Sequence, residues 1–284
     1  MRPLLYCLVL LAAAGRVAAA DATNDLPPKP WPPSPITDHF AARAGWFQGS
    51  VDTRGRVDDP ATGAPGTSFS AETDFKQSDA MHQLAVELVF RLRDRGRVRV
   101  DMWDLSRRGT ASPTRIIDYG QYNQANNSAF TPADIVESQT DWRQIDVTWT
   151  YSFLRASRYE LGAGFGVHLV QAEARARVSN RAQPVNEDFS GAGPFATVAL
   201  DGTWRFARYW SLSARAQYFN LTVSSVSGML GDYHGDVQYR WRPNLAFGIG
   251  YQSRQVQIEV SNSSPNGQMR MSISGPEAFV RACF

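Results

Sequence analysis

The end of the chain decides the fold: its last stretch reads Met269-Arg270-Met271-Ser272-Ile273-Ser274-Gly275-Pro276-Glu277-Ala278-Phe279-Val280-Arg281-Ala282-Cys283-Phe284. This stretch predicts a final strand that stops on the phenylalanine carboxylate of Phe284. Several earlier segments alternate apolar and polar residues in the same manner. Only a closed barrel lets a non-helical chain satisfy all its backbone amides in lipid. The sequence therefore predicts an all-β protein built as a closed, antiparallel transmembrane β-barrel.

Residues 1–20 are expected to be an export signal. Arg2 supplies the positive start, residues 4–11 form an apolar stretch, and Ala18-Ala19-Ala20 is a small-residue cleavage site. The apolar stretch is too short for a spanning helix, which needs about 20 residues. The mature chain is expected to begin at Asp21.

The mature chain is expected to have two parts. Residues 21–41 form a proline-rich periplasmic segment, because proline at this density blocks strand pairing and favours an extended spacer. This segment is either a disordered tail or a partner-binding segment anchored by Trp31. The barrel is expected over residues 42–284.

Composition narrows the class of protein without deciding the fold. The formal net charge of +2 argues against a nucleic-acid-binding protein. After cleavage only Cys283 remains, so an internal disulfide is excluded. Lysine occurs only at Lys29 and Lys76. Arginine suits buried ion pairs inside a barrel and lipid A phosphates outside it, although genomic base composition also explains the bias.

Alternation recurs along the mature chain. The first clear segment alternates apolar residues, Leu84, Val86, Leu88 and Phe90, with more polar ones. A tight turn follows at 93–96, and the alternation resumes beyond it. This pattern is typical of a hairpin with one apolar face. Equivalent alternating segments cover residues 145–153, 159–169, 196–206, 210–218, 237–241 and 245–251.

The connections between these segments have two lengths. The short ones are 93–96, 154–158, 207–209 and 242–244, and the long polar ones are 106–140, 179–193, 224–235 and 261–268. Short periplasmic turns and long external loops are typical of barrels in the Gram-negative outer membrane. A girdle of aromatic residues beside the short turns fits the periplasmic interface: Trp204, Phe206, Tyr209, Trp210, Tyr239 and Trp241.

Two strand counts remain open, about 12 and 10, both of them the even number usual for bacterial barrels. We favour 12, because residues 67–75 alternate cleanly and residues 45–54 and 114–122 can also serve as membrane strands. That interpretation makes 93–96 an external turn. In the alternative with 10 strands, 93–96 is periplasmic and two of the extra segments are external extensions or plugs.

The chain resembles small Gram-negative outer-membrane barrels of the broad OmpA/OmpW-like group, and more narrowly an uncharacterised proteobacterial family of barrel proteins. The stretches that carry the resemblance are residues 98–109, 159–168, 210–219 and the Ser274-Gly275-Pro276 ending. The resemblance covers most of the mature chain. It implies a fold and a location, and it implies no activity because fold does not confer function.

Charged residues of both signs fall on the inward face of the expected strands. They predict either a structural ion network that plugs a narrow barrel or a constricted, mildly anion-leaning pore. The predicted lumen residues are Glu87, Arg91, Arg99, Asp101, Asp146, Glu160, His168, Asp201, Arg205, Arg215, Asp236, Arg240 and Arg254.

Five glycines are also expected to face inward: Gly162, Gly164, Gly166, Gly248 and Gly250. Strand coiling explains them, since glycine relieves crowding where a sheet bends tightly. The sharper hypothesis is a sector of wall free of side chains, opposite the arginines, with room for water or a solute.

Few residues of the sequence support an enzymatic function. A lipid-modifying enzyme or protease needs a nucleophile and a base at the outer rim. His234 is expected on an external loop near Asp232, which is an ordinary turn composition, and His168 faces inward. No histidine pair has metal-ligand spacing. We therefore expect no enzymatic activity, no metal and no cofactor.

We expect a monomeric outer-membrane barrel that is structural or forms a narrow, weakly selective pore for small solutes. The alternatives are a surface adhesin or ligand binder, with loop residues such as Tyr119, Tyr122 and Phe130 in contact with the ligand, and an outer-membrane lipid-modifying enzyme. The expected partners are outer-membrane lipid and lipopolysaccharide, and the barrel-assembly machinery, which would read the final strand and Phe284. No nucleic acid is expected to bind.

Overall fold

A computed structural model describes residues 32–58, 65–118, 129–181, 185–223, 226–260 and 266–284. The expected export signal and Trp31 lie outside these residues. Within the described part of the chain, no helix is long and apolar enough to cross a membrane.

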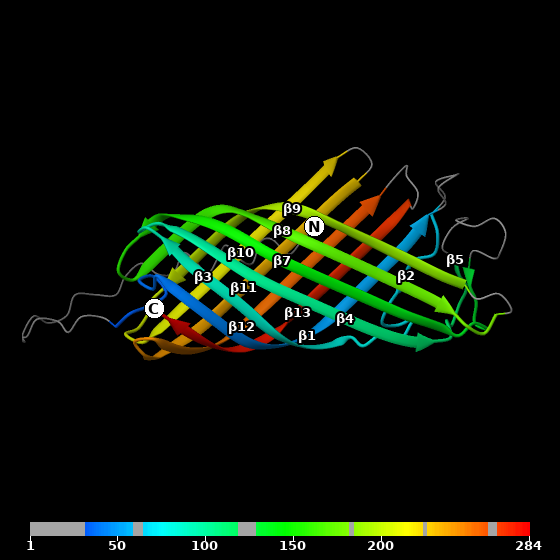
Figure 1. The fold of residues 1–284 in the computed structure, drawn as a ribbon, viewed down its shortest axis with the longest axis horizontal. Helices are drawn as coiled ribbons and strands as arrows, with labels where there is room; N and C mark the ends of the chain where they lie inside the picture. The colour runs from blue at the N-terminus through cyan, green and yellow to red at the C-terminus, as the bar shows by residue number, and fades with distance from the viewer. Residues whose placement is uncertain (1–31, 59–64, 119–128, 182–184, 224–225, 261–265) are drawn as a thin grey trace, which may run out of the picture. The chain divides into compact units, whose positions relative to one another are not determined.

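Ten long strands close into one antiparallel barrel over the described residues (Figure 1). They are β1 (Phe40–Asp58), β3 (Ala80–Leu92), β4 (Gly96–Ala111), β7 (Val136–Arg155), β8 (Tyr159–Val178), β9 (Val185–Trp204), β10 (Trp210–Val223), β11 (Val226–Arg242), β12 (Leu245–Val260) and β13 (Asn266–Cys283). Each strand pairs with the next along the chain, and β13 pairs with β1.

The closing pair joins the two ends of the barrel sequence. β1 and β13 pair from Ala41 opposite Cys283 to Asp58 opposite Asn266. The backbone amides of His39 and Phe40 both donate to the carbonyl oxygen of Phe284, at 2.9 and 3.0 Å. Closure removes the sheet edges that lipid could not satisfy.

The strand count corrects our preferred interpretation of the sequence and matches the alternative. Residues 67–75 form only the short strand β2 (Phe69–Ser70), which pairs with β1, and then a turn. Residues 114–122 contribute β5 (Ile117–Asp118), which pairs with β6 (Ala129–Phe130) in a separate two-stranded sheet. The turn at 93–96 therefore joins β3 to β4 at the same end as the other short turns.

We call the two ends the short-turn end, where Phe284 lies, and the loop end, where the long connections lie (Figure 1). In outer-membrane barrels these correspond to the periplasmic and external sides.

The exterior of the wall is apolar and the interior is polar over the half nearer the short-turn end. Leu84, Val198 and Ile249 are 61, 67 and 68% exposed, whereas Asp146 and Glu160 are 1 and 0% exposed. A soluble β-sandwich has the opposite arrangement. The alternation in the sequence is therefore that of a lipid-facing wall.

The two faces exchange character along each long strand. On β7, the outward face is apolar from Phe153 back to Ile145 and polar from Arg143 back to Glu137. The apolar part spans about nine residues, the length that a membrane strand requires. Beyond it the inward face becomes apolar, as at Trp142 and Val136, which are 2 and 0% exposed. The strands thus continue past the membrane as the wall of a conventional dry core.

This extension corrects the expected loop boundaries. Residues 224–235 and 179–193 were expected to be loops, yet β11 begins at Val226 and β9 at Val185. Outside lipid a strand needs no apolar outer face, so small and polar residues continue the backbone ladder without the alternation that marks a membrane strand.

Two pairings in the wall stop early. Toward the loop end, β3 pairs with β4 only as far as Val86, and β9 pairs with β10 only as far as Val198. Beyond these points the wall consists of two panels, one of β4, β7, β8 and β9 and the other of β10 to β13 with β1 and β3.

An arginine at the middle of the apolar band should prevent stable insertion. Leu200, on the outward face of β9 and 56% exposed, lies near the centre of the band. We expect Leu200→Arg to lower the free energy of unfolding from lipid vesicles, and so to destabilise the protein, by about 2–4 kcal/mol. Ser190→Arg, on the same face of the same strand but beyond the band, should change it by less than about 1 kcal/mol. Urea titration of the heat-modifiable band on gels measures both, and equal losses would contradict the assigned position of the membrane.

Candidate functional site

The interior of the barrel is the candidate site, and it is filled at four successive levels. From the short-turn end these are the plug segment (residues 32–39), an arginine layer, an apolar layer and an outer cap, each defined below by its residues.

The plug segment lies in the mouth of the barrel at the short-turn end. Ile36 and Asp38 are 2 and 8% exposed. The Asp38 carboxylate accepts a hydrogen bond from Arg240 at 2.5 Å and lies 3.9 Å from Arg281. This end of the proline-rich segment is therefore packed, while residues 21–31 lie outside the described part.

Arginine side chains also bind the main chain of the plug segment. Proline-rich chain offers carbonyl oxygens with few amide donors, and arginine supplies the missing donors. The contacts run from Arg91 to the Pro35 oxygen at 3.3 Å, from Arg155 to the Ile36 oxygen at 3.0 Å, and from Arg205 to the Pro32 oxygen.

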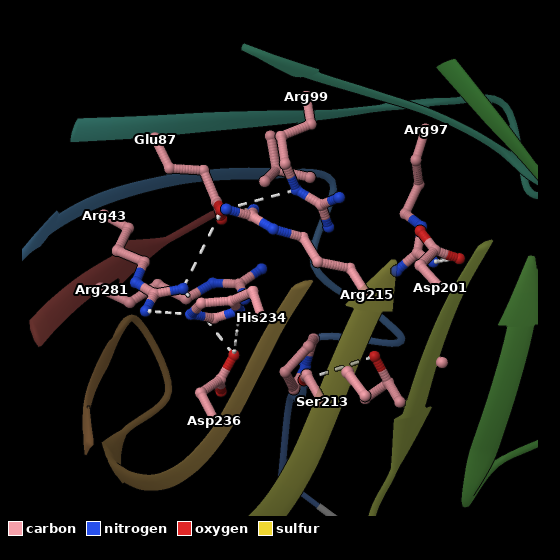
Figure 2. A pocket seen from close by; sticks show the side chains of 15 residues that line it. Arg43, Glu87, Arg97, Arg99, Asp201, Ser213, Arg215, His234, Asp236 and Arg281 are labelled. Atoms are coloured by element: carbon pink, nitrogen blue, oxygen red, sulfur yellow. Dashed lines mark hydrogen bonds and ion pairs between the residues drawn. The ribbon is translucent and has the colours of Figure 1, made fainter. Parts of the chain in front are cut away.

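The arginine layer lies next along the barrel (Figure 2). Its centre is Glu87, which contacts Arg215, lies 3.5 Å from the Nε of Arg99 and 3.9 Å from Arg43. Arg215 also lies 3.4 Å from Asp101. Each charge therefore has more than one partner, and the pairs join β1, β3, β4 and β10 across the interior.

A second group of the layer is built on Glu160, which is fully buried. Arg91 donates to both of its carboxylate oxygens, at 2.7 and 2.9 Å, and Arg97 lies 3.4 Å away. Arg97 continues to Asp201 at 2.6 Å. A two-point arginine–carboxylate contact fixes the position of both side chains.

A third group surrounds His168. The Nδ1 of His168 lies 2.6 Å from Asp146, and Arg254 lies 3.2 Å from Asp146 and 2.6 Å from Asp232. The Nε2 of His168 is 3.0 Å from the Gln217 side-chain oxygen. His168 is 0% exposed, so it is enclosed by the network.

The structure places the predicted charged residues inside the barrel, with Arg205 at the mouth and Asp236 3.7 Å from Arg43. Several members were missing from the prediction: Arg43, Arg97, Asp232, His234, Glu277 and Arg281. Arg97 was recoverable, because it lies two residues from Arg99 and so shares its face.

His234 and Asp232 require a correction. Both were expected on an external loop, but they lie on β11 with their side chains inside, 6 and 1% exposed. His234 lies 2.6 Å from Glu277 and 3.0 Å from Arg43. The flanking Gly231 and Gly235 resemble turn glycines in sequence but form part of the strand.

The space beside the inward glycines is occupied. The side chains of Asp201 and Gln217 fill the positions next to Gly162 and Gly166, and Gly164 lies against the backbone of β7. Next to Gly248 and Gly250 lie Phe279 and Glu277. The hypothesis of an open sector of wall is therefore corrected: these glycines make room for neighbouring side chains.

The apolar layer follows the arginine layer toward the loop end. It comprises buried Phe47, Val51, Met81, Trp103, Leu105, Trp142, Val170, Ala172, Leu230, Val256, Met271 and Ile273. The rings of Phe47 and Trp103 meet edge to face at 5.2 Å between centroids, and the Arg254 guanidinium lies 4.6 Å from the Trp103 ring centroid. Sequence reasoning missed this layer because it treated the whole inward face as polar.

The outer cap closes the loop end. Over the described residues it consists of residues 65–79 and the β5–β6 sheet, with Phe75, Ile117 and Phe130 packed against Val136 and Val178 on the inner wall. Phe130 was expected to face a ligand, but it is 5% exposed. Tyr119 and Tyr122 lie outside the described residues.

Two polar contacts fasten the cap. Arg107 of β4 donates to Glu72 at 2.5 Å. Near β6, Arg181 donates to both oxygens of Asp134, at 2.7 and 2.5 Å. The hydrogen bonds from Arg181 lower the pKa of Asp134 to about 2.

Two small cavities interrupt this packing, with volumes of about 30 and 20 Å³. Both lie in the arginine layer. Among the described residues, no group of three or more His, Cys, Asp or Glu side chains is placed to hold a metal ion.

Comparisons with known proteins identify the fold. Neither the known protein-family models nor the curated protein sequences contain a match. Among solved structures, the outer-membrane protease OmpT from Escherichia coli is 12% identical with a TM-score of 0.54, covering 86% of this chain and 97% of the protease. Less similar are the Bordetella autotransporter BrkA β-domain (12% identity, TM-score 0.36, coverage 87 and 100%) and the Pseudomonas putida toluene transporter TodX (10%, 0.34, 87 and 89%). The chain has the fold of outer-membrane β-barrels.

Removing one partner of the Arg91–Glu160 pair should be costly. We expect Arg91→Met to lower the free energy of unfolding by about 3–5 kcal/mol, because it leaves Glu160 buried with fewer donors. Replacing both residues by methionine should cost less than the sum of the single changes. Arg54→Met, whose ion pair with Asp52 is exposed, should change stability by less than about 1 kcal/mol. Additive losses in urea titrations of the Arg91 and Glu160 variants would rule out coupling.

The outer cap should loosen in acid. Asp134 has a folded-state pKa of about 2, below its ordinary value of 3.8. Its stabilising contribution is therefore complete above pH 3.8 and is lost as the pH falls through 2. Hydrogen exchange of residues 131–135, corrected for intrinsic rates, should accelerate over this interval. Asp134→Asn should exchange quickly already at neutral pH, and unchanged protection in that variant would refute the role of the carboxylate.

Proposed function

We propose that this protein is a monomeric outer-membrane barrel with a closed interior, whose role is structural and which does not conduct solutes. The observation that carries the proposal is the series of four obstructions along the barrel axis. A continuous pore would have to cross the plug segment, the arginine layer, the apolar layer and the outer cap, and the two cavities described within the arginine layer are water-sized.

The same arrangement argues against a narrow pore of the kind that the charge pattern also allowed. Water-filled channels in membrane barrels have polar interiors. Here Trp142, Leu230 and Val256 are 2, 0 and 3% exposed in the middle of the path. Opening this layer would require repacking a dry core, which proteins resist.

We propose no catalytic role. His168 and His234 are enclosed in the interior network, at 0 and 6% exposed. A hydrolytic base must reach a substrate at the lipid interface or the outer rim, whereas both histidines lie on the short-turn side of the apolar layer.

A second function is favoured by one specific observation. The strands continue well past the length that the membrane requires, and a packed cap covers their ends. A rigid external platform of this kind suits contact with a surface ligand. Binding to cells or matrix that is lost when the cap is deleted, in a variant that still folds, would support this adhesin-like role, and binding that is retained without the cap would contradict it.

Lipid and assembly contacts complete the proposal. Just beyond the apolar band, the outward residue Arg143 is exposed at the height expected for outer-leaflet headgroups, where guanidinium groups suit lipid A phosphates. Phe284 ends the closing strand with 70% of its surface exposed, a position suited to recognition by the assembly machinery.

The closed-barrel proposal predicts no conductance. Purified protein in planar bilayers should give no stepwise currents. Deleting residues 32–38 should not open the barrel, because the arginine and apolar layers remain in series. Folding of both proteins is checked by heat-modifiable mobility on gels. Regular conductance steps from the folded wild type would overturn the proposal.

A further inference from the structure

The four short turns lie together at one end of the barrel (Figure 1). Over residues 93–95, 155–158, 205–209 and 242–244 they carry seven arginines and one acidic side chain, Asp94. The terminal carboxylate of Phe284 lies at the same end. We use the name arginine collar for the exposed arginines of these turns: Arg93, Arg95, Arg158, Arg208 and Arg242.

The carboxylates of the barrel do not neutralise this collar. Asp94 lies 3.8 Å from Arg155, which is half-buried beside the collar. Over the described residues, no carboxylate oxygen lies within 4.0 Å of four members of the collar: Arg93, Arg95, Arg208 and Arg242. Burial and the positive charge of neighbouring arginines lower the pKa of Arg205, which lies in one of the turns. The short-turn end is therefore a positively charged rim.

The loop end of the barrel has a different charge pattern. There exposed arginines share the outward face with carboxylates, since Arg54 lies 3.4 Å from Asp52 and Arg175 lies 3.7 Å from Asp188. The whole chain has a formal net charge of only +2. The excess of positive charge is thus a local property of the short-turn end, and the general preference of the chain for arginine does not explain it.

The collar also lies at the level of the membrane interface. The Arg242 guanidinium carbon is 4.4 Å from the ring centroid of Trp241, and that of Arg208 is 5.6 Å from the ring centroid of Tyr209. Trp241 and Tyr209 are 52 and 41% exposed. Aromatic side chains in such a girdle mark the boundary between lipid and water in outer-membrane barrels. The guanidinium groups beside them therefore lie at the height of the lipid headgroups.

Position and charge together select the chemistry of a partner. A guanidinium binds phosphate oxygens through two parallel hydrogen bonds, which an ammonium group cannot reproduce. A zwitterionic headgroup brings a phosphate together with a cation that the collar repels, because Asp94 is the one acidic side chain in these turns. A headgroup with a net negative charge brings the phosphate without that cation. A soluble acidic partner would leave the lipid-facing rings beside the guanidinium groups unused.

We propose that the arginine collar binds anionic phospholipid headgroups in the membrane leaflet at the short-turn end. The collar then holds a shell of anionic lipid around the short turns and fixes the height of the barrel in the bilayer. This inference rests on the position assigned to the membrane above. It does not depend on a closed interior, so regular conductance from the barrel would leave it intact.

Native mass spectrometry identifies the lipids that stay bound to the protein. The full mature protein is released from detergent micelles that contain phosphatidylglycerol, which is anionic, and phosphatidylcholine, which is zwitterionic, in equal amounts. We expect the retained lipids to be enriched in phosphatidylglycerol by about fivefold for each occupied site. Equal retention of the two lipids by the folded wild type would overturn the proposal.

Charge variants locate the site on the barrel. A collar variant replaces four exposed arginines by glutamine and should lose the preference for phosphatidylglycerol: Arg93→Gln, Arg95→Gln, Arg208→Gln and Arg242→Gln. A matched control removes the same charge from the exposed outward face at the loop end and should keep the preference: Arg54→Gln, Arg108→Gln, Arg175→Gln and Arg270→Gln. Lysine at the four collar positions retains the charge and should keep most of the preference.

The heat-modifiable mobility of each variant on gels confirms that it has folded. Arg242→Gln alone is a milder change at an exposed turn position, and it should already lower the ratio of retained phosphatidylglycerol to phosphatidylcholine. An unchanged ratio in the folded collar variant, or an equal loss in the loop-end control, would show that the collar is not the lipid site.

Discussion

Every part of this structure depends on the need to pair each backbone amide within lipid. A membrane wall built of strands meets this need only when its first strand pairs with its last, here β1 with β13. Closure at ten strands then fixes an interior slightly wider than a barrel of eight, which its own side chains can fill. Long arginine and aromatic side chains fill this additional width.

The interior contains two environments because the membrane ends partway along the strands. Where lipid surrounds the wall, the outside is apolar and the inside is polar, so buried charges must satisfy one another. Where water surrounds the wall, the outside becomes polar and Trp103, Trp142 and Leu230 form a dry core within. The boundary between the arginine layer and the apolar layer therefore lies close to the height of the outer membrane surface. A single closed sheet carries both arrangements because its side chains point in and out alternately.

The sequence was sufficient to predict the strands of the barrel wall and many of the charged residues inside it. Alternation such as Leu84, Val86 and Leu88, when it recurs along a whole chain, indicates strands with one apolar face and one polar face. It was insufficient for the strand count, because residues 67–75 alternate in the same way while only Phe69–Ser70 forms a strand and Phe75 packs into the cap. It was also insufficient where polarity reverses, since Gly231 to Gly235 resemble a turn but belong to β11. Alternation with a period of two shows on which face of a sheet a residue lies. It does not show whether that face contacts water, lipid or a packed core.

The two early-ending pairings give the outer cap a mechanical meaning. Beyond Val86 and Val198 the two wall panels no longer share backbone hydrogen bonds along these seams. The cap draws Phe69 and Phe75 from the connection after β1, and it packs them against Val136 and Val178 of the other panel. The cap therefore links the two panels where backbone hydrogen bonds no longer do, so its aromatic contacts are what restrains the panels from moving apart at the loop end.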